Sequence, residues 1–209
     1  MQNRILTDRD REKYAPLIKK MFKVIPDMMS RKFDRANVQQ AFAVDLIMKK
    51  YKKGNDVLCV GSYEDTAFEY LKEIGYVMTD IDPQTNGFDL HKYLHSTDRL
   101  FDIVFSVSVM EHVDNDKQFI SDICRLLKPG GLGIVTVDFR EDYITSRKGA
   151  ANKPGGDFRL YTKADYDRIE DILSKYNCFF VDEFFVDAVP DFVYQNLTYS
   201  FSTMVFKKC

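Results

Sequence analysis

The sequence of 209 residues predicts an α/β fold in which helices cover both faces of a doubly wound, mostly parallel sheet. Unbroken apolar runs, typical of strands buried on both faces, alternate with segments that carry apolar residues at helical spacing. Two such units follow one another, at residues 57–83 and 101–139, and a β-rich tail begins near residue 179. This alternation predicts crossover connections and therefore parallel pairing.

The first unit, residues 57–83, gives the clearest indication of a ligand. Its first apolar run ends at Gly61, a helical segment follows, and Gly75 stands where that helix needs a left-handed cap. A second apolar run at residues 76–78 leads to Asp80, 19 positions after Gly61. A glycine turn and an acid at this spacing are typical of adenosine-binding units, in which the acid accepts hydrogen bonds from the ribose hydroxyls.

The second unit leads into a long connection and a tail of a different kind. An apolar strand at residues 101–110 precedes Glu111 and His112, and Asn115 begins a helix that is followed by a strand at residues 133–139. Residues 140–161 form a polar connection long enough for a functional lid at the carboxyl edge of the sheet. After a helix over residues 162–176, aromatic and β-branched strands at residues 179–186 and 197–207 should pair antiparallel.

Residues 1–53 predict a helical appendage, and residues 54–209 the α/β domain. Thr7 and Asp10 form a variant capping box before an amphipathic helix that ends ahead of Pro26, and a second helix spans about residues 36–53. Helices of this length are not stable alone in water, so they should pack on the sheet near its ligand-bearing edge.

The charge balance restricts the partners. The net charge is −2, but residues 1–53 carry 14 Lys and Arg against 6 Asp and Glu. This asymmetry favours either an anionic partner or a solvated helical surface. Nucleic acid is the weakest partner because basic residues and stacking aromatics do not interleave. Neither a secretory signal nor an apolar run long enough for a membrane span is visible, so we expect a cytoplasmic protein.

Five segments together resemble the class I S-adenosylmethionine-dependent methyltransferases. They read VLCVGSYED, TDIDP, FDIVFSVSVMEHV, LLKPGGLGIVTV and YSFSTMVFKK. The resemblance covers about residues 54–207 and implies a Rossmann-like, seven-stranded sheet in which only the last strand is antiparallel. It also implies that S-adenosyl-L-methionine is the cofactor.

The resemblance assigns expected roles in cofactor binding. Residues 60–63 would pass under the methionine and ribose, Asp80 would accept from the ribose hydroxyls, and Asp89 would meet the adenine amino group. The full set of expected cofactor-binding residues is Val60, Gly61, Ser62, Tyr63, Asp80, Ile81, Asp89, Ser106 and Val107. The turn departs from the family pattern, because Tyr63 and Asp65 stand where glycines are expected, which either shifts the cofactor or weakens its binding.

The chemistry requires few dedicated side chains. The methyl carbon of the cofactor is already electrophilic, so the protein mainly aligns the acceptor and excludes water. His112 is the candidate base; alternatively, Glu111 and His112 only orient the following loop. No metal site is expected, because His91 and His95 lack a third ligand. Basic residues of the lid and of the N-terminal helices suggest a small or glycan-type acceptor with negative charge, such as a nucleotide-linked sugar.

Two other functions compete with this interpretation. The missing glycines motivate a catalytically weak or inactive binding or partner module on the same fold. A nicotinamide-dependent oxidoreductase is disfavoured, because the sequence contains no G-x-G-x-x-G motif and no Tyr followed four residues later by Lys. The sequence does not indicate an oligomeric state.

Overall fold

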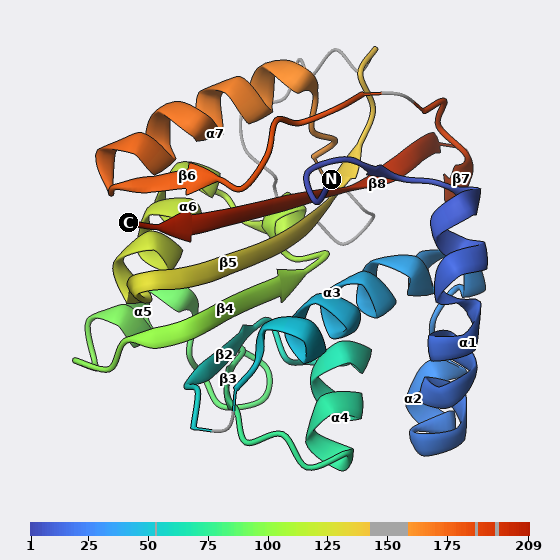
Figure 1. Cartoon of the computed structure of the whole chain (residues 1–209), viewed down its shortest axis with the longest axis horizontal. Coiled ribbons are helices and arrows are strands. Elements are labelled where there is room, and N and C mark those ends of the chain that lie inside the picture. Colours follow the sequence, from blue (N-terminus) through green and yellow to red (C-terminus); the bar gives the residue numbers. More distant parts are fainter. Residues whose placement is uncertain (53, 143–158, 187, 195–196) are drawn as a thin grey trace.

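The computed structural model describes residues 1–52, 54–142, 159–186, 188–194 and 197–209. The described helices are α1 (Asp8–Val24), α2 (Pro26–Met29), α3 (Asn37–Lys50), α4 (Thr66–Glu73), α5 (Leu90–Leu94), α6 (Asp116–Leu126) and α7 (Lys163–Lys175), with 3-10 turns η1 (Asp34–Ala36) and η2 (Met110–His112). The described strands are β1 (Ile5–Leu6), β2 (Val57–Val60), β3 (Thr79–Ile81), β4 (Phe101–Val107), β5 (Leu127–Phe139), β6 (Cys178–Phe180), β7 (Phe192–Tyr194) and β8 (Leu197–Lys208). Together they form an α/β fold around one sheet (Figure 1).

The sheet is parallel except at β8. Its order is β1-β8-β5-β4-β2-β3, and the pairs β2–β3, β2–β4 and β4–β5 are all parallel. The last strand, β8, pairs antiparallel with β5, β1, β6 and β7, so it alone runs against the other described strands. This confirms the predicted mostly parallel sheet with a reversed last strand.

The described residues form eight strands, whereas the sequence predicted seven. The additional pairing arises because β8 is 12 residues long and one of its edges is already covered by β5. Three short strands, β1, β6 and β7, share the other edge of β8. An edge covered in this way does not offer free backbone groups to another chain.

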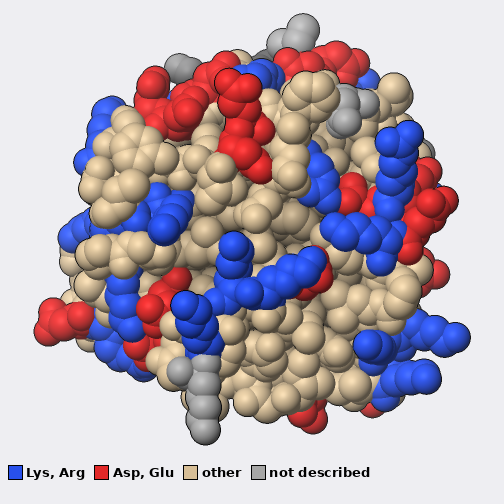
Figure 2. All heavy atoms as spheres, in the orientation of Figure 1, with Lys and Arg blue, Asp and Glu red and all other residues tan. Residues whose placement is uncertain are grey.

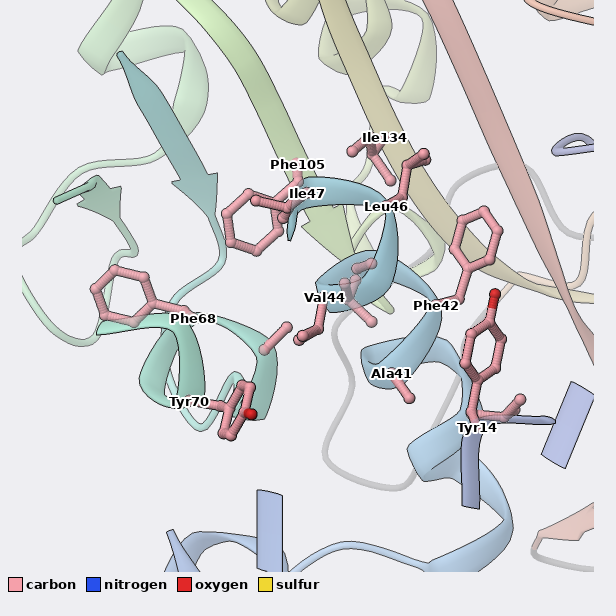
Figure 3. Close-up of a cluster of buried hydrophobic side chains, with 14 of the residues drawn as sticks. Tyr14, Ala41, Phe42, Val44, Leu46, Ile47, Phe68, Tyr70, Phe105 and Ile134 are labelled. Carbon is pink, nitrogen blue, oxygen red and sulfur yellow. The ribbon is translucent and has the colours of Figure 1, made fainter. Parts of the chain in front are cut away.

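Two apolar layers lie on the two faces of the sheet. One layer packs beneath α1, α3 and α4, and the other beneath α5, α6 and α7. Figure 3 shows Phe42, Leu46 and Ile47 of α3 in the first layer, near Phe105 of β4 and Ile134 of β5. Almost the whole circumference of α3 is buried, because the sheet lies on one side and α1 and α4 lie on the other. The predicted second helix is therefore a central element of the core.

Local signals in the sequence placed most helix starts correctly. Capping boxes formed by Thr7 with Asp10 and by Thr162 with Asp165 begin α1 and α7, and the Asn115 side chain accepts from the backbone N–H of Gln118 at the start of α6. Several strand boundaries differ from the prediction. β5 begins at Leu127 instead of residue 133, and β6 spans only Cys178–Phe180 where a strand over residues 179–186 was expected. β3 begins at Thr79, three residues late, and β4 ends at Val107 because the next residue turns into the left-handed region.

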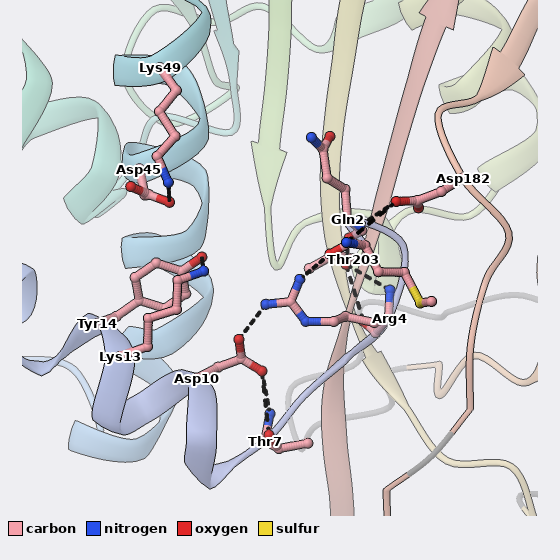
Figure 4. Close-up of polar contacts among 11 residues, drawn as sticks. Gln2, Arg4, Thr7, Asp10, Lys13, Tyr14, Asp45, Lys49, Asp182 and Thr203 are labelled. Atoms are coloured by element: carbon pink, nitrogen blue, oxygen red, sulfur yellow. Dashed lines mark hydrogen bonds and ion pairs between the residues drawn. The ribbon is translucent and has the colours of Figure 1, made fainter.

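The N-terminal segment is tied to the far end of the chain. Figure 4 shows the side chain of Arg4 bonded to Asp10, and the backbone near Gln2 bonded to Asp182. The buried Asn3 side chain donates to the carbonyl oxygens of Asp182 (2.6 Å) and Val205 (3.1 Å), and its Oδ1 accepts from the backbone N–H of Val205. The Asn3 side chain thus takes the place of a neighbouring strand at Val205 of β8.

The surface carries mixed charge. Figure 2 shows basic side chains spread over the whole visible face, with acidic ones gathered toward the edge where α7 lies. Within the described residues, none of the helices combines the length and the apolar composition that crossing a membrane requires.

We expect Asn3→Ala to lower the free energy of unfolding by about 2 kcal/mol, because it leaves the buried N–H of Val205 without its partner. The Val205 carbonyl loses one donor but keeps the backbone N–H of Val181. Urea denaturation measures this loss. The exposed Lys20→Ala serves as the control and should change stability by less than about 0.5 kcal/mol. A loss below about 1 kcal/mol for Asn3→Ala would show that water replaces the side chain.

Candidate functional site

Two pockets meet at the carboxyl ends of β2, β3 and β4. The apolar pocket has a volume of about 220 Å³ and is lined mainly by carbon atoms from Val60, Ile81, Pro83, Phe88, Leu90, Val109, Val113 and Phe119. The polar pocket, of about 260 Å³, is lined by residues that include Lys32, Asn37, Gln39, Gln40, Tyr63, Glu64, Asp65, Gln84, Val107 and Ser108. Gly61, Asp82 and Val109 line both pockets, so the two adjoin, and together they are called the cleft below.

Gly61 is fixed in this position by its backbone and by its neighbour. Its φ angle is +85°, and a Cβ atom there would lie 2.4 Å from Cγ2 of Val109. Its N–H donates to the carbonyl oxygen of Ile81 at 2.8 Å, which joins the end of β2 to the end of β3. Only glycine satisfies these conditions without moving the strand ends.

The rest of the turn does not need the glycines that the sequence lacks. Tyr63 is 49% exposed, and Asp65 caps α4 by accepting from the backbone N–H of Phe68 at 2.7 Å. The second left-handed position belongs to Glu64, whose φ angle is +54°. Tyr63 and Asp65 therefore line the polar pocket beside Gly61, and Asp65 also begins the helix.

Two acids, Asp80 and Asp82, lie at the carboxyl end of β3 and line different hollows. Asp80, the predicted ribose ligand, lines a neighbouring hollow that shares Tyr63 and Glu64 with the polar pocket, and its Oδ2 accepts from the Ser62 hydroxyl at 2.9 Å. Asp82 lies two residues further along, is 9% exposed and lines both pockets of the cleft. Its carboxylate accepts from the backbone N–H groups of Gln84 and Tyr63 and retains further lone pairs for a ligand.

The apolar pocket has polar groups only at its rim. Asp89 caps α5 by accepting from the backbone N–H of Lys92 at 2.8 Å. Nδ1 of His91 lies 2.9 Å from Oδ2 of the buried Asp122, and both residues line the same pocket. In the described part of the chain, no three His, Cys, Asp or Glu side chains are placed to hold a metal ion together. The pocket is suited to a flat, largely apolar group with polar edges.

The polar pocket contains buried polar atoms that have no hydrogen-bond partner among the described residues. Both polar atoms of the Asn37 side chain, Oε1 of Gln39 and Oδ2 of Asp65 belong to this group. Buried amide and carboxyl groups are normally hydrogen-bonded, and each unpaired one costs stability. Three of them on the wall of one pocket indicate that a polar ligand completes the hydrogen bonding there.

The other predicted residues have varied positions. Val60 and Ile81 line the apolar pocket, and Val107 lines the polar pocket. The buried Ser106 hydroxyl instead donates to the carbonyl oxygen of Val60 at 2.9 Å and so ties β4 to β2. His112 is exposed and lies outside the residues that line the cleft, so its catalytic role stays a prediction.

The predicted lid lies largely outside the described residues. Arg147, Lys148 and Lys153, which were expected to hold a charged acceptor, fall in residues 143–158. At the two ends of the segment, Arg140 pairs with Asp142 and Arg159 pairs with the buried Asp116. These two arginines are therefore already engaged by carboxylates.

A comparison with known proteins gives three findings. A family model described as a methyltransferase domain matches residues 14–179. Ubiquinone biosynthesis O-methyltransferases are similar over short segments: 32% identity over 72 residues for that of Rickettsia conorii, which covers 34% of this chain and 22% of the relative. For Rickettsia prowazekii the values are 34% identity over 85 residues, 38% of this chain and 33% of the relative. The aligned segments thus span at most about a third of the relatives' length.

Solved structures share the fold at low sequence identity. The 1,6-didemethyltoxoflavin-N1-methyltransferase of Burkholderia thailandensis, solved with its substrate and S-adenosylhomocysteine, has a TM-score of 0.57 at 16% identity and covers 94% of this chain and 89% of its own. An S-adenosylmethionine-dependent methyltransferase of Methanosarcina mazei has a TM-score of 0.56 at 15% identity and covers 78% of this chain and 96% of its own.

Gly61→Ala should destabilise the protein by about 3 kcal/mol, because the new methyl group meets both an unfavourable φ angle and the Val109 side chain. Gly75→Ala is the matched control: its φ angle is +96°, but nothing lies within 4 Å, so only the backbone cost of about 1 kcal/mol applies. Thermal and urea denaturation compare the two. Adding Val109→Ala should restore part of the loss at Gly61, and equal losses at both glycines would contradict the packing argument.

Burial raises the pKa of Asp65 to about 6, above the ordinary value of 3.8. Between these values the folded state keeps a proton that the unfolded state has released, so stability should fall as the pH rises from about 4 to 6. Asp65→Asn keeps a capping oxygen without the charge. It should therefore be more stable than the wild type by about 1–3 kcal/mol at pH 7.5 and equal to it at pH 4.

Urea denaturation across this pH range measures the difference. Asp27→Asn, on an exposed acid of α2, is the control and should follow the wild type at every pH. A constant difference between Asp65→Asn and the wild type would show that Asp65 does not change its protonation in this range.

Proposed function

We propose, because this chain belongs to the methyltransferase domain family, that the cleft around Gly61 binds S-adenosylmethionine and that the enzyme methylates a hydroxyl group of a small acceptor. S-adenosylmethionine is the methyl donor of the enzyme. The observation that carries the proposal is the joining of an apolar and a polar pocket at Gly61, with one acid on the boundary. A ligand with a nucleoside at one end and an amino acid at the other requires this division.

The residues of each pocket match one part of the cofactor. We assign the apolar pocket to the adenine ring, with Asp89 at its polar edge, and Asp82 to the ribose hydroxyls. The unpaired side chains of Asn37 and Gln39 would bind the amino and carboxyl groups of the methionyl part. The negative charges of Asp82 and Glu64 complement the positive charges of the sulfonium and the amino group.

The relatives support oxygen as the attacking atom. The curated proteins that the chain resembles are named O-methyltransferases. The Burkholderia enzyme of similar fold is named an N1-methyltransferase, so it supports a small-molecule acceptor but not the choice of oxygen. The sugar hydroxyl expected from the sequence and the hydroxyl of a phenol would both offer oxygen as the attacking atom. The described cleft lining does not favour a negatively charged acceptor, because the acids Glu64, Asp65 and Asp82 face a single lysine, Lys32.

The geometry of the turn supports an active enzyme over an inactive module. The inactive alternative was motivated by Tyr63 and Asp65 in place of glycines, yet Gly61 still lines both pockets beside them. Nζ of Lys32 and Oε2 of Glu64 lie 3.9 Å apart, and both residues line the polar pocket. The amide side chains of α3 line the same pocket. A cleft of this form is suited to hold both a cofactor and an acceptor.

Asp82→Asn should weaken the binding of S-adenosylhomocysteine by about tenfold to a hundredfold, since a neutral amide accepts more weakly from the ribose hydroxyls. Asp80→Asn, the matched control in the neighbouring hollow, should change the Kd by less than about threefold. Isothermal titration calorimetry measures both. A larger effect at Asp80 would reverse the assignment, and the absence of wild-type binding at millimolar concentration would contradict the proposed cofactor site.

Transfer of a labelled methyl group tests the acceptor class. Simple phenols such as catechol represent aromatic hydroxyls, and UDP-glucose represents the sugar acceptors that the sequence predicted. Label transferred to either supports the hydroxyl proposal, whereas label transferred only to amines or thiols would contradict it. Asp82→Asn should lower the transfer in parallel with its loss of cofactor affinity.

A further inference from the structure

Two carboxyl groups lie buried behind the polar pocket and take no part in the cofactor assignment. Glu111 is 0% exposed and Asp138 is 5% exposed. We propose that they form a proton-accepting pair that receives the proton of the acceptor hydroxyl through Ser108. The inference rests on the proposed function and identifies how the same site removes a proton during methyl transfer.

Ser108 links the pair to the cleft. It follows the last residue of β4, lines the polar pocket, and its hydroxyl donates to Oε1 of Glu111 at 2.7 Å. Its φ angle is +57°, a conformation that costs a serine about 1–2 kcal/mol. This backbone angle turns the chain from the strand into η2, so that Ser108 and Glu111 face each other.

The strand register brings Asp138 to the same face of the sheet. Val107, which lines the polar pocket, pairs with Thr136, so their side chains lie on one face. Asp138 is two residues beyond Thr136 on β5 and therefore shares that face. The two carboxyl groups lie close enough together for the charge of Glu111 to raise the pKa of Asp138. The pair thus lies behind the lining of the polar pocket and is connected to it by Ser108.

Several buried oxygens around the pair have no hydrogen-bond partner among the described residues. Oε2 of Glu111, Oδ1 of Asp138, Oγ1 of Thr136 and Oγ of Ser200 are all in this state. Thr136 is fully buried and belongs to the same sheet face as Asp138. Unpaired hydroxyl and carboxyl oxygens at one place indicate that a polar ligand or a mobile proton is accommodated there.

Burial and mutual repulsion divide the roles of the two acids. Desolvation raises the pKa of Glu111, and desolvation together with the charge of Glu111 raises the pKa of Asp138 well above its ordinary value. The ionisable groups that face the pair are His112, whose charge lowers the pKa of Glu111, and the hydroxyls of Tyr161 and Tyr199. Two carboxyl groups in one buried site do not both ionise, so Asp138 keeps a proton while Glu111 loses one.

The resulting proton step is balanced. As the acceptor oxygen bonds to the methyl carbon, the carbon–sulfur bond breaks and its electron pair stays on sulfur, so the hydroxyl proton must leave. Ser108 Oγ takes that proton and passes its own to Oε1 of Glu111, which becomes neutral. Asp138 remains protonated throughout and keeps negative charge from accumulating in the site. After product release, the proton of Glu111 returns to solvent.

Infrared spectroscopy tests the pair without turnover. Protonated buried carboxyl groups absorb separately from carboxylates, so the wild type at pH 7 should show a protonated band that Asp138→Asn removes. Asp116→Asn is the matched control, because Asp116 is also buried but pairs with Arg159 and Arg168. It should leave the band unchanged. A wild-type spectrum without this band would overturn the proposal, whether or not an acceptor has been found.

The pH dependence of methyl transfer to the hydroxyl probe tests the step itself. We expect the wild-type kcat to rise with pH through a value above the ordinary carboxyl range, as Glu111 ionises. Glu111→Gln keeps a partner for Ser108 but accepts no proton, so it should lower kcat about a hundredfold and abolish this rise. Asp138→Asn should lower kcat less than tenfold and keep the rise.

The two readouts separate failure of this inference from failure of the proposed function. If Glu111→Gln still binds S-adenosylhomocysteine and still shows the pH-dependent rise, the proton pair is wrong while the cofactor site stands. If the wild type does not bind S-adenosylhomocysteine, the proposed function fails, and the infrared result alone decides whether the pair shares a proton. Asp116→Asn should leave the shape of the pH profile unchanged, because the Asp116 carboxylate is paired with Arg159 and Arg168 and makes no hydrogen bond to Ser108.

Discussion

The contact between Gly61 and Val109 is the constraint on which the cleft depends. These residues follow the adjacent strands β2 and β4, and a single added methyl group would lie 2.4 Å from the valine side chain. Their close approach separates an apolar pocket from a polar one yet leaves the two connected. Asp82 lies on the same boundary, because it lines both pockets together with these two residues.

The sequence predicted features that depend on local chemistry and missed those that depend on distant pairing. Capping boxes and apolar periodicity located α1, α6 and α7 because each signal lies within a few residues. The pairing of β1 with β8 was missed, since two residues near the N-terminus carry no pattern that points to residues 201–202. In the site, Asp80 and Asp82 both fit the spacing from Gly61, and only the fold distinguishes the hollows they line.

The polar pocket is maintained at a cost in stability. Asn37 and Gln39 come from the buried start of α3, where their amides have no partner among the described residues, and Asp65 is held in a place that raises its pKa. Sequence reasoning could not assign them, because polar residues at a helix start are also expected for solubility. Such groups are retained where a ligand supplies the missing hydrogen bonds, and natural proteins accept instability at such sites.

The hold of Asn3 on β8 has a consequence for the order of folding. Asn3 is synthesised about two hundred residues before its partner Val205. Until then the outer edge of β5 has no neighbour, and the N-terminal helices have only a partial sheet to cover. Contacts between such distant residues slow folding, and an open strand edge exposes the nascent chain to aggregation. The nascent chain is therefore most open to aggregation in the interval before β8 is made.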